Sequence, residues 1–199
     1  MKVRGFALIE IAIVLAVIAI LAAVLTPLLM NYAEQGRIAR AQGDVASIAN
    51  AMRLYRRDTG RWPIYSSQAT YDSQQCCGGT SSLIGSGAGS NPADGTAIWN
   101  VSTRISSTSL ELFINGNLSN VTTAGSFPRP HFGGPYIGNL DADPWGHKYI
   151  LTGANMFEDA IDHAFVISAG PNGQLDTENN QADQQPMVAG PDDIVAEIR

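Results

Sequence analysis

Residues 11–30 form an almost unbroken apolar run, and no other feature constrains the fold as strongly. Only Thr26 and Pro27 interrupt it. At about 1.5 Å of rise per residue, a helix of this length crosses the roughly 30 Å hydrocarbon layer of a bilayer. A cleavable secretory signal is the competing interpretation, but the run is too long for an ordinary signal core and no small-x-small cleavage site follows it. The run predicts one membrane-spanning helix, with about 170 residues outside the membrane.

Charged residues flank the apolar run on both sides. Lys2 and Arg4 precede it and favour a cytoplasmic N-terminus, whereas Arg37 and Arg40 follow it within the range that also influences orientation. Charge alone therefore separates the two orientations only weakly.

The formal net charge of −6 conceals opposite charges in two parts of the chain. Residues 31–61 have a local balance of +3 and residues 158–199 a balance of −8. Either both are solvated faces, or like subunits stack with the basic stretch of one near the acidic end of another. The arginines lack interleaved aromatic residues and the overall field is negative, which argues against a nucleic-acid partner.

Helical periodicity continues beyond the apolar run. Apolar residues recur at spacings of seven, three, four and three on one helical stripe: Ile38, Val45, Ile48, Met52 and Tyr55. Gly60 is a helix stop, and Pro63 follows it. The pattern predicts one helix from about Phe6 to Asp58 with an amphipathic second half.

The remaining chain changes character twice. Residues 66–130 are rich in Ser and Gly and predict an irregular or mobile loop, with one short helix within 105–116. Short β-rich runs at 147–152, 163–168 and 192–198 are bounded by turn residues and predict three strands.

The tetrapeptide from Asp143 to Gly146 predicts a tight corner. Asp143 can initiate a turn, Pro144 fixes φ and Gly146 permits a positive φ, while Trp145 is a large apolar anchor. We interpret this corner as structural rather than catalytic.

Cysteines and histidines predict no catalytic or zinc centre. Cys76 and Cys77 are adjacent, and they form either a strained vicinal disulfide or a pair of inert thiols. His131, His147 and His163 match no zinc spacing. The sequence also holds no nucleophile elbow, phosphate loop or paired catalytic acids, so we expect a protein that is not an enzyme.

Glu10 stands at the N-terminal edge of the apolar run. An ionisable residue in a membrane segment costs several kcal/mol unless it has a partner. Either Glu10 reaches the membrane interface, or it has a functional partner.

The residues around Glu10 resemble the start of a type IV pilin. A short basic leader, MKVRG, precedes Phe6, and Glu10 is the fifth residue from there. The resemblance implies that residues 1–5 are a leader cut after Gly5 by a prepilin peptidase, and that Phe6 becomes N-methylated. It also implies that Glu10 pairs with the amine of Phe6 on a neighbouring subunit. Ala7 departs from the pattern, because threonine is usual there.

Three further segments narrow this resemblance. Residues 55–63, 133–150 and 166–194 resemble signatures of the major pseudopilins of type II secretion. Together with the leader and the helix they cover roughly half the chain, distributed along its whole length.

The resemblance implies an α+β fold. The second half of a long N-terminal helix would pack on a small C-terminal antiparallel sheet with a calcium-type loop. The chain would then comprise a leader (1–5), a membrane-spanning and filament-core helix (6–30), an amphipathic stem (31–60), a variable Ser/Gly-rich region (61–132) and a sheet with an acidic loop (133–199).

The implied function is that of a structural subunit. It would be anchored in the inner membrane by one helix, with its N-terminus in the cytoplasm, and would polymerise into a periplasmic filament that drives the export of folded proteins. The implied partners are like subunits, minor pseudopilins, the prepilin peptidase, and the inner-membrane assembly platform with its ATPase. Two alternatives stay open: a subunit of a type IV pilus for adhesion or motility, and a membrane-tethered calcium-binding module that never polymerises.

Residues 170–194 form an acidic, turn-rich stretch. It carries hard oxygen ligands of the kind that calcium prefers: Asn172, Asp176, Glu178, Asp183, Asp192 and Asp193. Composition alone also fits a solvated acidic loop. The resemblance implies structural calcium, with Asn172 at a family aspartate, Asp192 and Asp193 at the family's paired aspartates, and backbone carbonyls completing the shell. Asp176 is the candidate to replace the charge lost at Asn172, and about fifteen inserted residues precede the aspartate pair.

Overall fold

Two compact units make up the chain, Met1–Arg37 and Ile38–Arg199. The computed structural model describes residues 8–60, 62, 83–95, 99–105, 109–115, 133–152, 164–177 and 189–198. The predicted processing residues Gly5 and Phe6, like the adjacent Cys76 and Cys77, lie outside these ranges.

Helix α1 (Leu8–Thr59) begins in the first unit, where its large apolar side chains are exposed. Their exposed fractions range from 48% at Ile11 to 88% at Leu8. The helix is long and apolar enough to cross a membrane and continues through Pro27. The long N-terminal helix predicted from hydropathy and periodicity is therefore confirmed over its described length.

The C-terminal part of α1 buries one stripe in the core of the second unit. Its buried residues are Ala41, Val45, Ile48, Ala49, Ala51, Met52 and Tyr55. The predicted stripe is thus confirmed from Val45 onward, whereas Ile38 is only partly covered. Gly60, at φ 73°, donates its N–H to the carbonyl of Arg56 (2.7 Å) and ends the helix.

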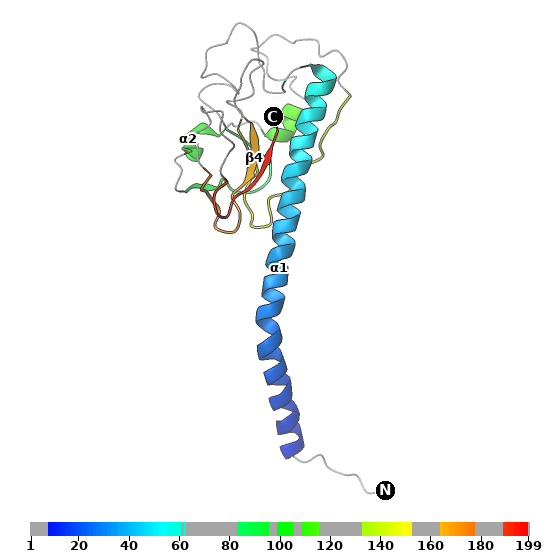
Figure 1. Ribbon diagram of the computed structural model, residues 1–199, viewed down its shortest axis with the longest axis vertical. Coiled ribbons are helices and arrows are strands. Elements are labelled where there is room, and N and C mark those ends of the chain that lie inside the picture. Colours follow the sequence, from blue (N-terminus) through cyan, green and yellow to red (C-terminus); the bar gives the residue numbers. More distant parts are fainter. Residues whose placement is uncertain are drawn as a thin grey trace. The chain divides into compact units, whose positions relative to one another are not determined.

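Four short strands form an antiparallel sheet in the order β1-β3-β4-β6. They are β1 (Leu83–Gly85), β3 (Ile150–Thr152), β4 (Phe165–Ser168) and β6 (Ile194–Glu197). Figure 1 shows β4 and β6 beside the C-terminal part of α1. β3, β4 and β6 confirm the three predicted strands, and each lies inside its predicted run.

Strands β1, β3 and β4 are buried on both faces, and β6 is partly buried. One row of paired residues faces the core that contains the α1 stripe: Ile84, Leu151, Val166 and Ala196. On the opposite face Ile150 and Ile167 pack with Trp99 and Leu175 in a second core. Burial on both faces explains why these strands are continuous apolar runs without polar alternation.

Part of the Ser/Gly-rich region has regular structure, contrary to the prediction of an irregular loop over 66–130. β1, the short strand β2 (Ala93–Asp94) and helix α2 (Val101–Arg104) all lie there. The predicted short helix is also present, as α3 (Leu110–Ile114). The prediction missed β1 because a three-residue strand buried on both faces has no periodicity to detect.

Hydrogen bonds join α1 to the ends of the sheet. The Tyr149 hydroxyl donates to Asp44 (2.7 Å). Burial is the main cause that raises the pKa of Tyr149, and the hydrogen bond to Asp44 raises this pKa further. The Arg53 guanidinium donates to the carbonyls of Glu197 (2.6 Å) and Ile198 (3.1 Å) at the end of β6. These bonds fix the C-terminal end of β6, the strand into which the acidic segment leads.

Candidate cation site

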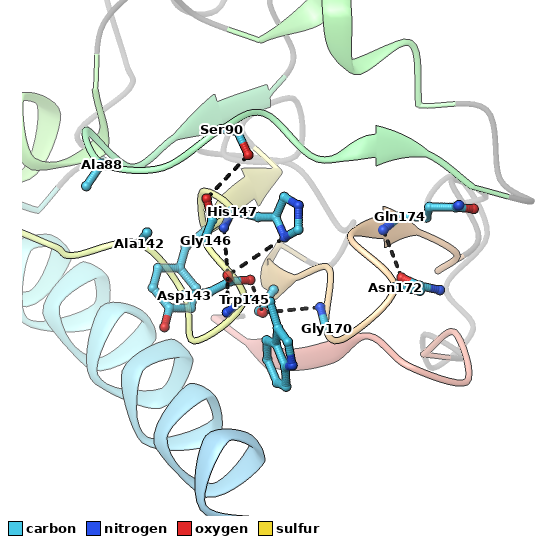
Figure 2. A network of polar contacts seen from close by, with 12 residues as sticks. Ala88, Ser90, Ala142, Asp143, Trp145, Gly146, His147, Gly170, Asn172 and Gln174 are labelled. Carbon is cyan, nitrogen blue, oxygen red and sulfur yellow. Dashed lines mark hydrogen bonds and ion pairs between the residues drawn. The ribbon is translucent and has the colours of Figure 1, made fainter. Parts of the chain in front are cut away.

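Asp143 is the centre of a buried corner before β3. Its Oδ1 accepts the backbone N–H groups of Trp145 (3.1 Å) and His147 (2.7 Å), while its Oδ2 accepts the hydroxyl of Ser168 (2.8 Å). Asp143 is 3% exposed, and Gly146 has φ 94°. Figure 2 shows Asp143 beside Trp145 and His147 in this corner. The structure therefore confirms the predicted structural corner.

The corner contacts the start of the acidic loop. Gly170 donates its N–H to the Ser168 hydroxyl oxygen (3.4 Å), and Gly173 donates to the Gly170 carbonyl (3.3 Å). The His147 ring packs on Gly173 so closely that a Cβ there would lie 2.5 Å from ring carbon Cε1. This packing and the φ of 68° require glycine at this position.

Asn172 and Asp176 are linked across a turn. The Asn172 Oδ1 accepts the N–H of Gln174 (2.8 Å), as Figure 2 shows, and its Nδ2 donates to Asp176 Oδ2 (2.8 Å). Gln174 belongs to β5 (Gln174–Leu175), which pairs in parallel with β2. The amide of Asn172 therefore orients the turn and the carboxylate of Asp176.

Asp193 carries the buried carboxylate of this loop. Its Oδ2 accepts N–H groups from Asp176 (3.0 Å) and Thr177 (2.6 Å) and the Thr177 hydroxyl (2.5 Å). Its Oδ1 is buried and receives no hydrogen bond within the described part of the chain. Burial raises the pKa of Asp193, and the charge of Asp176 adds to this rise, while the hydrogen bonds from Thr177 and Asp176 oppose it.

Gly95 and Gly190 leave room for Asp176 to pack against the backbone of two other segments. A Cβ at Gly95 would collide with the Asp176 carboxylate, and a Cβ at Gly190 would lie 2.6 Å from Asp176 Cβ. Asp176 is thus held between the β2 segment and the segment that leads into β6.

The paired aspartates differ in environment. Asp192 is exposed and its backbone carbonyl contacts Gly170, where a Cβ could not be accommodated. Asp193, by contrast, is 8% exposed. The resemblance treats the two as a pair, whereas the structure buries only the second carboxylate.

The predicted ligands are therefore only partly brought together. Asn172 contacts Asp176, and Asp176 approaches Asp193 through its backbone N–H and its charge. Among the described residues, no group of three or more His, Cys, Asp and Glu side chains is arranged to hold a metal ion. Glu178 and Asp183 lie outside those residues.

Sequence reasoning missed Thr177, Gly95 and Gly190. Thr177 lies inside the acidic stretch but carries no charge, so a search for ionisable ligands passes over it. Glu10, the predicted assembly residue, lies in the first turn of α1 and is exposed.

Comparisons with known proteins place these features in context. Residues 115–186 match the family model described as Type II secretion system (T2SS), protein G. No solved structure was found that matches the chain.

Several curated relatives carry the name Type II secretion system core protein G. The protein of that name from Escherichia coli (strain K12) is 27% identical over 179 residues, which cover 90% of this chain and 89% of the relative. The one from Aeromonas hydrophila is 25% identical over 176 residues, 88% of each chain. The one from Pseudomonas aeruginosa is 39% identical over 59 residues, 30% of this chain and 42% of the relative.

Proposed function

We infer the function from family membership: this chain belongs to the type II secretion system core protein G family, the type IV pilin-like major pseudopilins. It is a structural protein and not an enzyme. The observation that carries this conclusion is the alignment with the Escherichia coli relative, because it spans 90% of this chain and so includes both the helix and the sheet.

Subunit assembly through α1 is our proposal for how the protein works. The exposed apolar side chains of its first part, up to Met30, need a partner other than water. We place this part in the inner membrane before assembly, with the N-terminus in the cytoplasm, and in the centre of a periplasmic filament afterwards. Minor pseudopilins, the prepilin peptidase and the assembly platform with its ATPase would be its partners.

Processing at the N-terminus would prepare the chain for assembly. We propose cleavage between Gly5 and Phe6 and N-methylation of Phe6, which creates a new amine beside the apolar run. That amine, on one subunit, would neutralise Glu10 of the next. A filament interior without bulk water makes an unpaired carboxylate costly, so this pair would also set the axial register.

Deleting the gene in the bacterium that carries it tests the secretion function. We expect secreted proteins to accumulate in the periplasm, because the filament that drives their export cannot form, and reintroducing the intact gene should restore export. Loss of long surface fibres with normal export would instead identify a pilus subunit. Normal export together with an uncleaved leader on the protein would favour a tethered module that does not polymerise.

Calcium binding at the acidic loop is a further part of the proposal. The buried Asp193 Oδ1 lacks a donor within the described residues, and the neighbouring Asp176 carboxylate adds negative charge. A hard divalent cation would satisfy both, so these residues fit calcium. Asp193 and Asp176 would supply carboxylate oxygens, Asn172 and Asp192 would lie at the edge of the site, and the bound ion would hold the loop against the sheet.

Calcium addition and removal test this part. We expect millimolar calcium to raise the melting temperature of the full chain in detergent by about 5–10 °C if it reaches a hundred times the Kd, because the ion binds only the folded loop. A chelator should lower the melting temperature to that of the metal-free chain. Circular dichroism is the readout, and Asp193→Asn should abolish the shift while Asp141→Asn keeps it. A melting temperature that responds to neither reagent would remove the calcium proposal.

A further inference from the structure

We propose that Thr177 is a positioning residue for the cation: it holds one oxygen of Asp193 so that the other oxygen is presented to the ion. The proposal rests on the calcium binding proposed above. Thr177 is not a ligand in this scheme, and its effect on the ion passes through Asp193.

Thr177 contacts a single oxygen of Asp193 twice. Its N–H and its hydroxyl both donate to Oδ2, at 2.6 and 2.5 Å, and the N–H of Asp176 adds a third bond to the same atom at 3.0 Å. Three donors saturate Oδ2, whereas Oδ1 has none within the described residues. The carboxylate is therefore fixed in rotation, and its unused oxygen is buried.

Thr177 is itself held from two other parts of the chain. Its carbonyl accepts the indole N–H of Trp99 (2.8 Å), and its hydroxyl oxygen accepts the N–H of Gly190 (3.1 Å). Thr177 is fully buried, and Trp99 belongs to the core on the far face of the sheet. These contacts fix the position of Thr177 and, through it, the position of Asp193 Oδ2.

The surroundings of the Asp193 carboxylate favour a bound cation. A buried carboxylate with one saturated and one bare oxygen is stable only when a proton or a cation meets the bare oxygen. Asp176 is adjacent to Asp193, since its N–H donates to Asp193 Oδ2 (3.0 Å), so a divalent ion at this place would have two carboxylates of the acidic loop. Mutation of a residue that orients a ligating carboxylate in this way typically weakens metal binding by about 10- to 100-fold.

The test measures the calcium Kd of the full chain in detergent by isothermal titration calorimetry after removal of metal. Thr177→Val removes the hydroxyl at nearly constant volume and should weaken calcium binding at least about tenfold. Thr177→Ser restores the hydroxyl and should bind within about threefold of the unaltered chain.

Thr152→Val is the matched control. Thr152 is also a buried threonine whose hydroxyl bonds to backbone, since its Oγ1 accepts the N–H of Phe165 (2.9 Å), but it lies on β3. This variant loses a comparable hydrogen bond and should keep the calcium Kd of the unaltered chain, so a general loss of stability cannot imitate the expected result.

Two results would overturn the positioning role. Calcium binding by Thr177→Val with an unchanged Kd is one, and equally weak binding by Thr177→Ser and Thr177→Val is the other. If Thr177→Val does not fold, Trp99→Phe releases the Thr177 carbonyl and should weaken calcium binding severalfold, and an unchanged Kd there counts against the role in the same way. An unaltered chain that binds no calcium overturns the calcium proposal itself, which is a separate outcome.

Discussion

Asp143 illustrates how a single buried side chain connects the corner to the acidic loop. Its carboxylate accepts two backbone N–H groups of the corner and the hydroxyl of Ser168, the last residue of β4. Ser168 in turn accepts the N–H of Gly170, where the acidic loop begins. One carboxylate therefore fixes the distance between two turns that lie on either side of β3 and β4.

Asp143→Ala should destabilise the second unit by about 3–5 kcal/mol, because three buried donors lose their acceptor. Asp143→Asn keeps the oxygen that accepts the two backbone N–H groups and should cost about 1 kcal/mol. The measurement is urea unfolding of the full chain in detergent, followed by tryptophan fluorescence. Asp141→Ala is the control, because that side chain is 91% exposed and should change stability by less than about 0.5 kcal/mol. Equal stabilities for Asp143→Ala and Asp141→Ala would contradict the role assigned to the corner.

Elements were predictable from sequence where their periodicity is long or their turns are distinctive. α1 was predicted because an apolar run and a stripe at helical spacing continue over many turns, and β3, β4 and β6 because turn residues bound short apolar runs. β1, β2 and β5 have two or three residues each, so no pattern can repeat within them. Their positions are set by pairing with strands that are distant in sequence, and local sequence patterns do not reveal this pairing.

The sequence predicted which residues contribute to the candidate site but not how they are arranged. Composition singled out Asn172, Asp176 and Asp193, and the resemblance assigned Asn172 and Asp193 to calcium. Their different environments depend on contacts from elsewhere in the chain. Thr177 saturates one oxygen of Asp193, and Gly95 makes room for Asp176. Such contacts join segments that are more than ten residues apart, so local spacing carries no signal for them.

The edge strand β6 also depends on a distant residue. Arg53 of α1 donates to two carbonyl groups at the end of β6, and Asn50 accepts another N–H of the same guanidinium (2.9 Å). An arginine that occupies the carbonyl groups of an edge strand hinders pairing with another chain there. In the assembly through α1 proposed above, this arrangement favours contacts through α1 over contacts through the sheet.

At the scale of the whole molecule, the two units meet different requirements. The second unit buries its apolar residues in two cores on either side of the sheet. The first unit, up to Arg37, exposes the apolar side chains of α1. A membrane or other copies of the same helix would cover these side chains, and in a filament Glu10 would have no bulk water around it.

Glu10→Gln should therefore reduce filament yield at least about tenfold, because the amide cannot neutralise the Phe6 amine of the neighbouring subunit and the pair no longer selects the register. Membrane insertion should persist, since Gln costs less than Glu in an apolar layer. Sheared filaments are quantified by immunoblot, and extraction with carbonate reports insertion. Glu34→Gln is the matched control: Glu34 lies on the same helix beyond the apolar run, 3.5 Å from Arg37 in an exposed pair, and should leave the yield unchanged. Filament yields that are equal for Glu10→Gln and the unaltered chain would show that Glu10 has no part in assembly.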